Sequence, residues 1–448
     1  MSRIRNLLAL LREQLWVVPV LMTAAALPLA YAMSGLGLGE PRGTDLRWLF
    51  SGDAGTARDL LSTLLSGLMT MTSLVVSITF VVLTLAAGQL GPRLISTFIR
   101  DRQIQAVLGL FLATTFYVLV VLRGLDEALG PGGVPHLAVT GASALTVACL
   151  FALLFYVHKV ARSIIADTVV GKVAGELRLA VRAMLPEEGA DTGDAAPGVG
   201  ASPPRAGWVS LGRSGYVQTI DHEALVGVAR RADAVLGVAV RAGHFILSRG
   251  EHVEVRSFHA VVDERLAGAI RAAVIVGPGC SPAQDLEYAV RQLVEIALRA
   301  LSPGINDPFT AVAVVDQLAA ALEEVLARPA RPAVLRDAGD EARVVADRSG
   351  VGGLFNAALD QIRQAAGEHP AVLIHAADTL GKLAPVLGRE EARRAGLEHL
   401  ARLGETAEGT RLAPGDRAAA LARIGRARAA VEARSTGAGR GGGTGSPG

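Results

Sequence analysis

Six hydroxyl side chains in one uncharged stretch are the residues of this chain best placed for chemistry in a membrane. Residues 60–92 contain no Asp, Glu, Lys or Arg. Within them, hydroxyl side chains recur at spacings of three, four and seven residues: Thr63, Ser66, Thr70, Ser73, Ser77 and Thr84. These spacings place all six side chains along one face of a helix. Such a face can line a weakly polar path or hydrogen-bond to a neighbouring helix.

Two interpretations of this face stay open from the sequence. Small and hydroxyl side chains let helix backbones approach closely and hydrogen-bond across an interface, so the face could serve only in packing. Alternatively, copies of the helix surround an axis in an oligomer, and the hydroxyl groups line the space between them. Ionisable groups inside a membrane usually mark proton or ion relays. Because this stretch contains none, a proton-relay transporter is disfavoured.

A second polar cluster lies in the more polar half of the chain, at a predicted junction between two helices. Its residues are Ser302, Pro303, Gly304, Asn306, Asp307 and Pro308, followed by Thr310. Pro303 and Gly304 are expected to end one helix. Asp307 before Pro308 is a favourable start for the next helix, because Asp caps free amide groups and Pro suits the first turn. An anion site at the helix start is the alternative, which the charge of Asp307 opposes.

Metal and catalytic chemistry receive little support from the sequence. Four of the nine histidines fall in one segment, at His222, His244, His252 and His259, but without HxH or HxxxH spacing or a supporting cysteine. The two cysteines, Cys149 and Cys280, lie in an apolar and a soluble segment, which makes a disulfide between them unlikely. GxSxG, P-loop, HExxH, paired-carboxylate and dinucleotide-binding motifs are all lacking. We therefore expect no enzyme activity, no cofactor and no metal.

Four apolar stretches must position the hydroxyl face. We predict a membrane domain over 1–162 with transmembrane helices at about 15–36, 60–87, 104–122 and 137–157, because roughly 20 apolar residues cross a bilayer as a helix. A composition of 51% hydrophobic residues and a mean hydropathy of +0.39 agree with a protein that lies partly in lipid. The net charge of only +2 argues against a nucleic-acid partner.

The basic residues indicate how the four helices are oriented. Arg3, Arg5 and Arg12 precede the first helix, three further arginines lie between 93 and 102, and Lys159 and Arg162 follow the fourth helix. Cytoplasmic loops carry an excess of Lys and Arg. The pattern therefore favours a four-pass protein with both termini, and everything after residue 160, in the cytoplasm.

The cytoplasmic half is expected to be an α+β domain. The predicted fold class is therefore a mainly α membrane protein with four transmembrane helices and a cytoplasmic α+β domain. We predict an exit helix at 163–185, a flexible linker at 186–207, a small β-rich module at 208–280, a helical domain at 281–433 and a disordered tail at 434–448. Within the helical domain, a break is expected at about 328–350. Glu287, Arg291, Glu295 and Arg299 recur every four residues and predict ion pairs along one face of a helix.

Two blocks of the sequence resemble an uncharacterised family of bacterial inner-membrane proteins, a domain of unknown function. One block is 68–123, with Gln89-Leu-Gly-Pro-Arg93 and Phe98-Ile-Arg-Asp-Arg102. The other is Arg291-Gln-Leu-Val-Glu-Ile-Ala-Leu-Arg-Ala-Leu-Ser-Pro-Gly-Ile-Asn-Asp-Pro308, preceded by Gln284-Asp285. The resemblance covers roughly residues 10–385. It implies a plasma-membrane protein with a cytoplasmic domain and transfers no catalytic residue.

Two classes of function follow from these observations. The first is an oligomeric channel or transport-related protein, with the hydroxyl face at the axis and the soluble half as a regulatory domain. Its partners would be the lipid bilayer and further copies of the same chain. The second is a membrane-anchored sensing or protein-interaction module that conducts nothing, in which the hydroxyl face serves only in packing.

Overall fold

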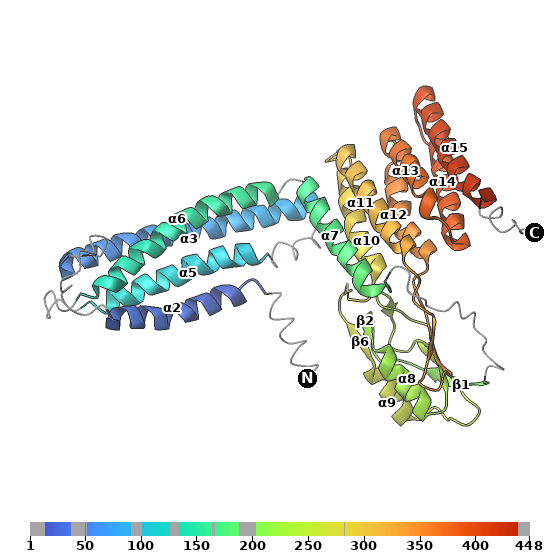
Figure 1. The fold of residues 1–448 in the computed structure, drawn as a ribbon, viewed down its shortest axis with the longest axis horizontal. Helices are drawn as coiled ribbons and strands as arrows, with labels where there is room; N and C mark the ends of the chain where they lie inside the picture. The colour runs from blue at the N-terminus through green and yellow to red at the C-terminus, as the bar shows by residue number, and fades with distance from the viewer. Residues whose placement is uncertain are drawn as a thin grey trace, which may run out of the picture. The chain divides into compact units, whose positions relative to one another are not determined.

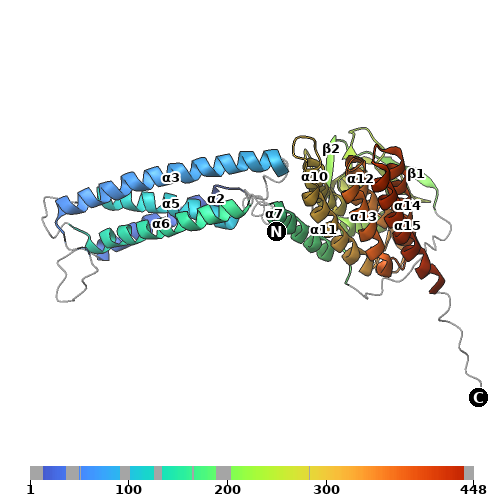
Figure 2. The ribbon, with the colours of Figure 1, turned by 90° about the horizontal axis from the view of Figure 1, so that it is seen from above.

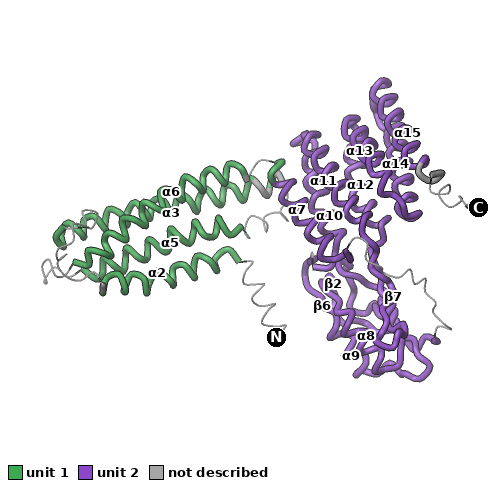
Figure 3. Tube along the Cα trace, viewed as in Figure 1, with its two compact units in different colours: residues 1–168 green, residues 169–448 purple. Residues whose placement is uncertain are grey.

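The computed structural model describes residues 14–36, 50, 52–90, 101–125, 134–163, 166–187, 203–281 and 283–437. The chain divides into two compact units, residues 1–168 and 169–448, which Figure 3 shows in green and purple. The fold class predicted from the sequence is confirmed. Unit 1 contains four long apolar helices, and unit 2 combines small β sheets with helices.

Unit 1 consists of helices that run side by side in both views (Figures 1 and 2). They are α2 (Val17–Leu36), α3 (Ala54–Leu90), α5 (Arg102–Arg123) and α6 (His136–Ser163). Each is long and apolar enough to cross a membrane. Helix α3 begins six residues before the predicted start, because the helix continues through the charged residues Arg58 and Asp59. At its start, the carboxylate of Asp53 accepts a hydrogen bond from the backbone N–H of Thr56.

Helix α5 is the most buried of the four and forms the centre of unit 1. Phe111, Tyr117 and Val121 are almost fully enclosed there. At Gly109 a Cβ atom would lie 2.5 Å from the sulfur of Met22 and 3.2 Å from Cα of Pro19. Glycine at this position therefore lets α2 and α5 approach closely, as small residues do between membrane helices.

Polar contacts at the two ends of unit 1 fix the direction of its helices. At one end, Nζ of Lys159 near the end of α6 lies 2.8 Å from the carboxylate of Asp101, which caps the start of α5. At the other end, Nδ1 of His136 at the start of α6 lies 2.8 Å from the carbonyl oxygen of Phe50, just before α3. Helices α3 and α6 therefore start at the same end, and α5 starts at the opposite end.

Unit 2 contains two small β sheets with helices α8 (His222–Arg231) and α9 (Glu264–Ala272). The five-stranded sheet has the order β1-β5-β3-β8-β7, and the three-stranded sheet has the order β4-β2-β6. The strands are β1 (Arg205–Val209), β2 (Gly215–Ile220), β3 (Val235–Val238), β4 (Phe245–Ile246), β5 (Val253–Arg256), β6 (Val274–Gly277), β7 (Val334–Arg336) and β8 (Ala342–Ala346). All neighbouring strands are antiparallel except β3 and β8.

The larger sheet extends beyond the module predicted at 208–280. Strand β1 begins at Arg205, and β7 and β8 come from the stretch that the sequence indicated only as a break at 328–350. Strand β8 pairs in parallel with β3, with Leu236 opposite Val344. Strands this short carry little periodicity, and a partner about a hundred residues away leaves no local signal.

The remaining helices of unit 2 stack in two layers (Figure 1). Helix α7 (Ala166–Met184) precedes the sheets, and its Arg182 forms an ion pair with Glu324 of α11. Helices α10, α12 and α14 form one layer, and α11, α13 and α15 the other. Their bounds are α10 (Leu286–Ala300), α11 (Pro308–Ala327), α12 (Val351–Ala365), α13 (Pro370–Lys382), α14 (Glu390–Gly409) and α15 (Pro414–Gly437), with a 3₁₀ turn η3 (Ala384–Val386). Successive hairpins thus bury one another's apolar faces, as in helical repeat proteins.

Candidate functional site

The hydroxyl side chains of α3 lie on the outside of unit 1. All six residues, named together the hydroxyl face, are exposed: Thr63, Ser66, Thr70, Ser73, Ser77 and Thr84. The buried side of the same helix is formed by Leu61, Leu68, Val75 and Val82. At about 100° per residue these two sets are about half a turn apart. The other helices of the same chain therefore pack against the buried side of α3 and not against the hydroxyl face.

Most groups of the hydroxyl face bond to their own helix. Thr63 donates to the carbonyl of Asp59 at 2.8 Å, and Thr70 donates to that of Ser66 at 3.0 Å. Ser66 and Thr84 also donate to the carbonyl one turn earlier. Each hydroxyl keeps oxygen lone pairs that can accept a further hydrogen bond or approach a cation. By contrast, the half-buried Thr79 hydrogen-bonds across the bundle to the hydroxyl of Tyr156.

The surroundings of the hydroxyl face are strongly apolar. Large exposed side chains flank it on α3 itself: Met69, Val76 and Phe80 on one side and Leu74, Val81 and Leu85 on the other. The outward sides of α2 and α6 carry large apolar side chains, among them Leu21, Leu29, Phe151 and Leu154, and His158 and Arg162 are exposed near the end of α6. The hydroxyl face is thus a narrow polar stripe between apolar borders. Between Thr63 and Thr84 it extends about 30 Å, the thickness of the hydrocarbon core.

The polar cluster at 302–310 forms the turn between α10 and α11. Asp307 caps α11: its carboxylate accepts from the backbone N–H of Thr310 at 3.2 Å, and Pro308 occupies the first turn. The hydroxyl of Ser302 donates to the carbonyl of Arg299 at 2.6 Å. Asn306 has φ of +52°, a left-handed conformation that Asn adopts more readily than most residues. Pro303 and Gly304 are exposed in the same turn. Capping and turn formation therefore account for this cluster.

The four histidines of the β region do not converge. His252 is buried, and its Nδ1 accepts a hydrogen bond from the backbone N–H of Leu211 at 3.0 Å. Burial lowers the pKa of His252, and also that of His222 and His244. His259 is exposed. Among the residues that the structure describes, no group of three His, Cys, Asp or Glu side chains is arranged to hold a metal ion.

A buried ion-pair network around Glu287 is the feature that the sequence did not reveal. Its side chain is only 9% exposed and accepts from Arg241 at 3.1 Å, from Arg291 at 2.7 Å and from the hydroxyl of Ser349. Arg241 also contacts Asp347 at 2.9 Å. Burial raises the pKa of Glu287, but the hydrogen bond from Ser349 and the two arginines outweigh it, so its pKa is lowered. The network ties α10 to the segments that follow β3 and β8.

The spacing of apolar residues around Glu287 indicates that its side chain is buried. The sequence indicated ion pairs from Glu287 along a polar face of α10, and the pair with Arg291 is present. However, Val290 and Val294 lie three and seven residues after Glu287, on the same side of the helix, and both are buried. Apolar residues at these positions indicate that the carboxylate belongs to the buried stripe.

Comparison with known proteins gives a family and relatives of unknown function. The family described as "Predicted membrane protein (DUF2254)" matches residues 12–382. Uncharacterized proteins of Mycobacterium tuberculosis and Mycobacterium bovis are each 31% identical over 382 residues, which cover 83% of this chain and 72% of the relative. No solved structure matches the chain.

Proposed function

Because the chain belongs to the family of predicted membrane proteins DUF2254, we propose that it is a homo-oligomeric channel or transport-related protein of the bacterial inner membrane. In this proposal, copies of the chain meet through the hydroxyl face of α3, which lines a path for ions or small polar solutes. The soluble unit has a regulatory role. Neither enzyme activity nor nucleic-acid binding is part of the proposal, since the sequence carries no motif or charge for either.

One observation supports this proposal above the others: the hydroxyl face is the polar stripe on the outward side of α3. Side chains of this size allow close contact between helices, and the apolar residues on either side can pack against a neighbouring copy. The oxygen lone pairs along the stripe would then face one another across a narrow space. The length of the stripe, about 30 Å, matches the hydrocarbon core.

The basic residues at the ends of the helices support the orientation that we propose in the membrane. The start of α5 and the end of α6 lie together, and this end carries Arg102, Lys159 and Arg162. Under the positive-inside rule this end faces the cytoplasm. With four spans, the N-terminus and unit 2 then lie on the cytoplasmic side as well.

Cross-linking between copies tests the assembly. We expect Ser73→Cys, in a chain whose Cys149 and Cys280 are replaced by Ala, to form disulfide-linked dimers when membranes are oxidised. A disulfide requires Cα atoms about 4.4–6.8 Å apart, which only closely packed helices provide. The matched control is Phe151→Cys on the outward side of α6, which is expected to stay monomeric. Equal cross-linking of both variants, or of the control alone, would contradict assembly through α3.

Flux through reconstituted liposomes tests conduction. We expect the triple replacement of Thr70, Ser73 and Ser77 by Leu to reduce ion or solute flux at least about tenfold, because an apolar constriction excludes water from a narrow path. The control variant changes the flanking residues Val76 and Val81 to Leu and should conduct like the wild type. Absence of flux in the wild-type protein under every imposed gradient would remove the conduction part of the proposal.

A second candidate function is a membrane-anchored sensing module that conducts nothing. A pocket in unit 2 lined by Arg331 and Arg348 favours it. If liposomes show no flux but unit 2 of the intact protein binds a ligand, this function replaces the first.

A further inference from the structure

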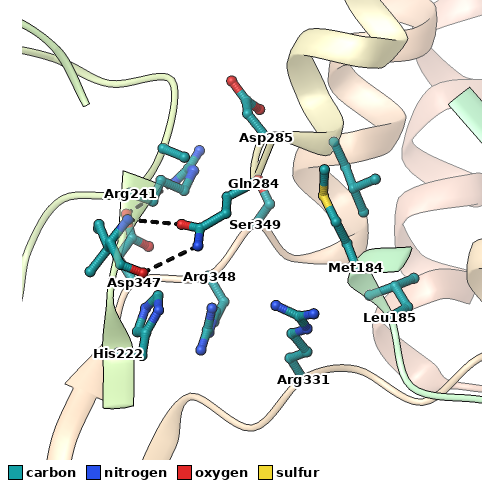
Figure 4. Close-up of a pocket in the computed structure, with 13 residues that line it drawn as sticks. Met184, Leu185, His222, Arg241, Gln284, Asp285, Arg331, Asp347, Arg348 and Ser349 are labelled. Carbon is teal, nitrogen blue, oxygen red and sulfur yellow. Dashed lines mark hydrogen bonds and ion pairs between the residues drawn. The ribbon is translucent and has the colours of Figure 1, made fainter. Parts of the chain in front are cut away.

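Unit 2 contains a pocket between the end of α7, the start of α8, the start of α10 and the segments that follow α11 and β8 (Figure 4). Its free volume is about 90 Å³. Gln284 fixes one wall, because its side-chain amide accepts from the backbone N–H of Ile220 at 2.9 Å and donates to the carbonyl of the same residue at 3.2 Å. These two hydrogen bonds tie the segment before α10 to the end of β2 and so fix this wall of the pocket.

Two arginines line this pocket and have no carboxylate partner among the residues that the structure describes. Arg331 follows α11 and Arg348 follows β8, and Figure 4 shows both guanidinium groups on the same side of the pocket, with His222 nearby. Among the described residues, neither arginine takes part in an ion pair. Nε of Arg348 is buried and has no hydrogen-bond partner in this part of the chain. A buried donor without a partner is costly in a folded protein.

The charges around Arg348 increase this cost. Burial lowers the pKa of Arg348, and the positive charge of Arg331 lowers it further. Burial and then Arg348 also lower the pKa of His222, so that the imidazole is held in its neutral form. Unfavourable electrostatics of this kind concentrate at functional sites, where a ligand compensates for them.

The acidic groups in the pocket already have other partners. Asp347 accepts from Arg241 at 2.9 Å, and Asp285 caps α10 by accepting from the backbone N–H of Tyr288 at 3.0 Å. Burial raises the pKa of Asp285 above its ordinary value. Arg241 itself is occupied by Glu287 and Asp347. Among the described residues, the arginines of the pocket that take part in no ion pair are therefore the exposed Arg331 and the half-buried Arg348.

We propose that this pocket binds the phosphate group of a phosphate monoester or of inorganic phosphate, held by Arg331 and Arg348. Guanidinium groups match phosphate oxygens with paired N–H donors, and such charge-assisted bonds are among the strongest in proteins. The free volume of about 90 Å³ is sufficient for a phosphate group. The remainder of a larger ligand extends through the opening. The inference concerns unit 2 alone and holds whether or not α3 lines a path.

Calorimetric titration of the full-length protein in detergent with inorganic phosphate tests this site. We expect saturable binding in the wild type and binding at least about tenfold weaker in Arg348→Gln and in Arg331→Gln, since each change removes charge-assisted hydrogen bonds to the phosphate. The double variant should not bind measurably. Arg249→Gln, on the exposed turn between β4 and β5, is the matched control and should bind like the wild type.

Thermal unfolding distinguishes a binding role from a structural one. In phosphate-free buffer, Arg348→Gln should unfold at the same temperature as the wild type or higher, because it removes an unpaired charge. Phosphate should raise the unfolding temperature of the wild type and leave that of the variant unchanged. A variant that is less stable without phosphate, or that responds to phosphate like the wild type, would overturn the proposal.

A further titration identifies the source of the phosphate. Detergent micelles containing phosphatidic acid present the same phosphate monoester on a lipid. Binding of inorganic phosphate indicates a soluble ligand, and binding of phosphatidic acid alone indicates a lipid headgroup. Either result supports the site if Arg331→Gln and Arg348→Gln weaken it. Failure of both probes to bind would overturn it.

Discussion

Replacing Glu287 with Ala is expected to lower the free energy of unfolding of unit 2 by about 3 kcal/mol. Removing one partner of a buried ion pair typically costs about 3–5 kcal/mol, because the remaining charge is left uncompensated. Here the carboxylate serves two arginines and the hydroxyl of Ser349. Arg241 and Arg291 are 30% and 46% exposed and can turn partly to water. The lower end of the range therefore applies.

The loss of stability in Glu287→Ala can be measured by the fluorescence of Trp208 in β1 during urea unfolding of the full-length protein in detergent. The other two tryptophans, Trp16 and Trp48, are replaced by Phe so that unit 2 alone is followed. Glu287→Gln keeps the volume and one acceptor, so it should lose clearly less stability than Glu287→Ala. Glu323→Ala, on an exposed position of α11, should stay within about 0.5 kcal/mol of the parent protein. A change below about 1 kcal/mol for Glu287→Ala would show that the network does not hold unit 2 together.

The fold could be predicted largely because helices leave periodic signals in the sequence. The apolar stretches indicated the four spans of unit 1, and Asp307-Pro308 located the start of α11 to the residue. Strands β7 and β8 could not be predicted in this way. They are three and five residues long, and β8 is held in place by β3, which is distant in the chain. The residues around a short strand do not show which distant strand it pairs with.

The candidate sites were predictable only in part. Spacing placed the six hydroxyl residues on one face of α3, but only the structure shows that this face is opposite the stripe that packs the bundle. The pocket of Arg331 and Arg348 had no sequence signal. The two residues lie on either side of the β7–β8 hairpin, whose antiparallel pairing, with Val334 opposite Val345, brings them close together. The pairing of β8 with β3 then connects this hairpin to the rest of the sheet.

Acid is expected to destabilise unit 2 through His399 on α14. This side chain is 2% exposed, its ring lies 6.0 Å from that of Phe355, and its Nε2–H donates to Oδ1 of Asn356 at 3.0 Å. Burial lowers its pKa to about 4; Asp360 acts in the opposite direction, and Arg402 and Arg363 add to the lowering. Nδ1 is therefore unprotonated in the folded protein at neutral pH.

The sign of the effect follows from the two pKa values of His399. Between pH 6.5, its ordinary value, and pH 4, the unfolded chain binds a proton that the folded chain does not, so stability falls as the pH is lowered through this window. At neutral pH the imidazole is largely unprotonated in both the folded and the unfolded chain, so His399 causes almost no loss of stability there. About 2 kcal/mol is lost by pH 5 and about 3 kcal/mol below pH 4. The three histidines His222, His244 and His252 add losses in the same direction, since their pKa values are also lowered.

Comparison of variants isolates the part due to His399. His399→Gln keeps a donor for Asn356 but cannot gain a proton, so its free energy of unfolding at pH 5 should fall by about 2 kcal/mol less, relative to pH 7, than that of the parent protein. His375→Gln is the matched control: His375 lies on α13, is 26% exposed and contacts Asp316. It should keep the loss of stability that is due to His399. If His399→Gln loses as much stability between pH 7 and pH 5 as the parent, the imidazole of His399 is already protonated in the folded protein at pH 5. Asp360, whose carboxylate lies 3.9 Å from Nδ1, would then be its counter-ion.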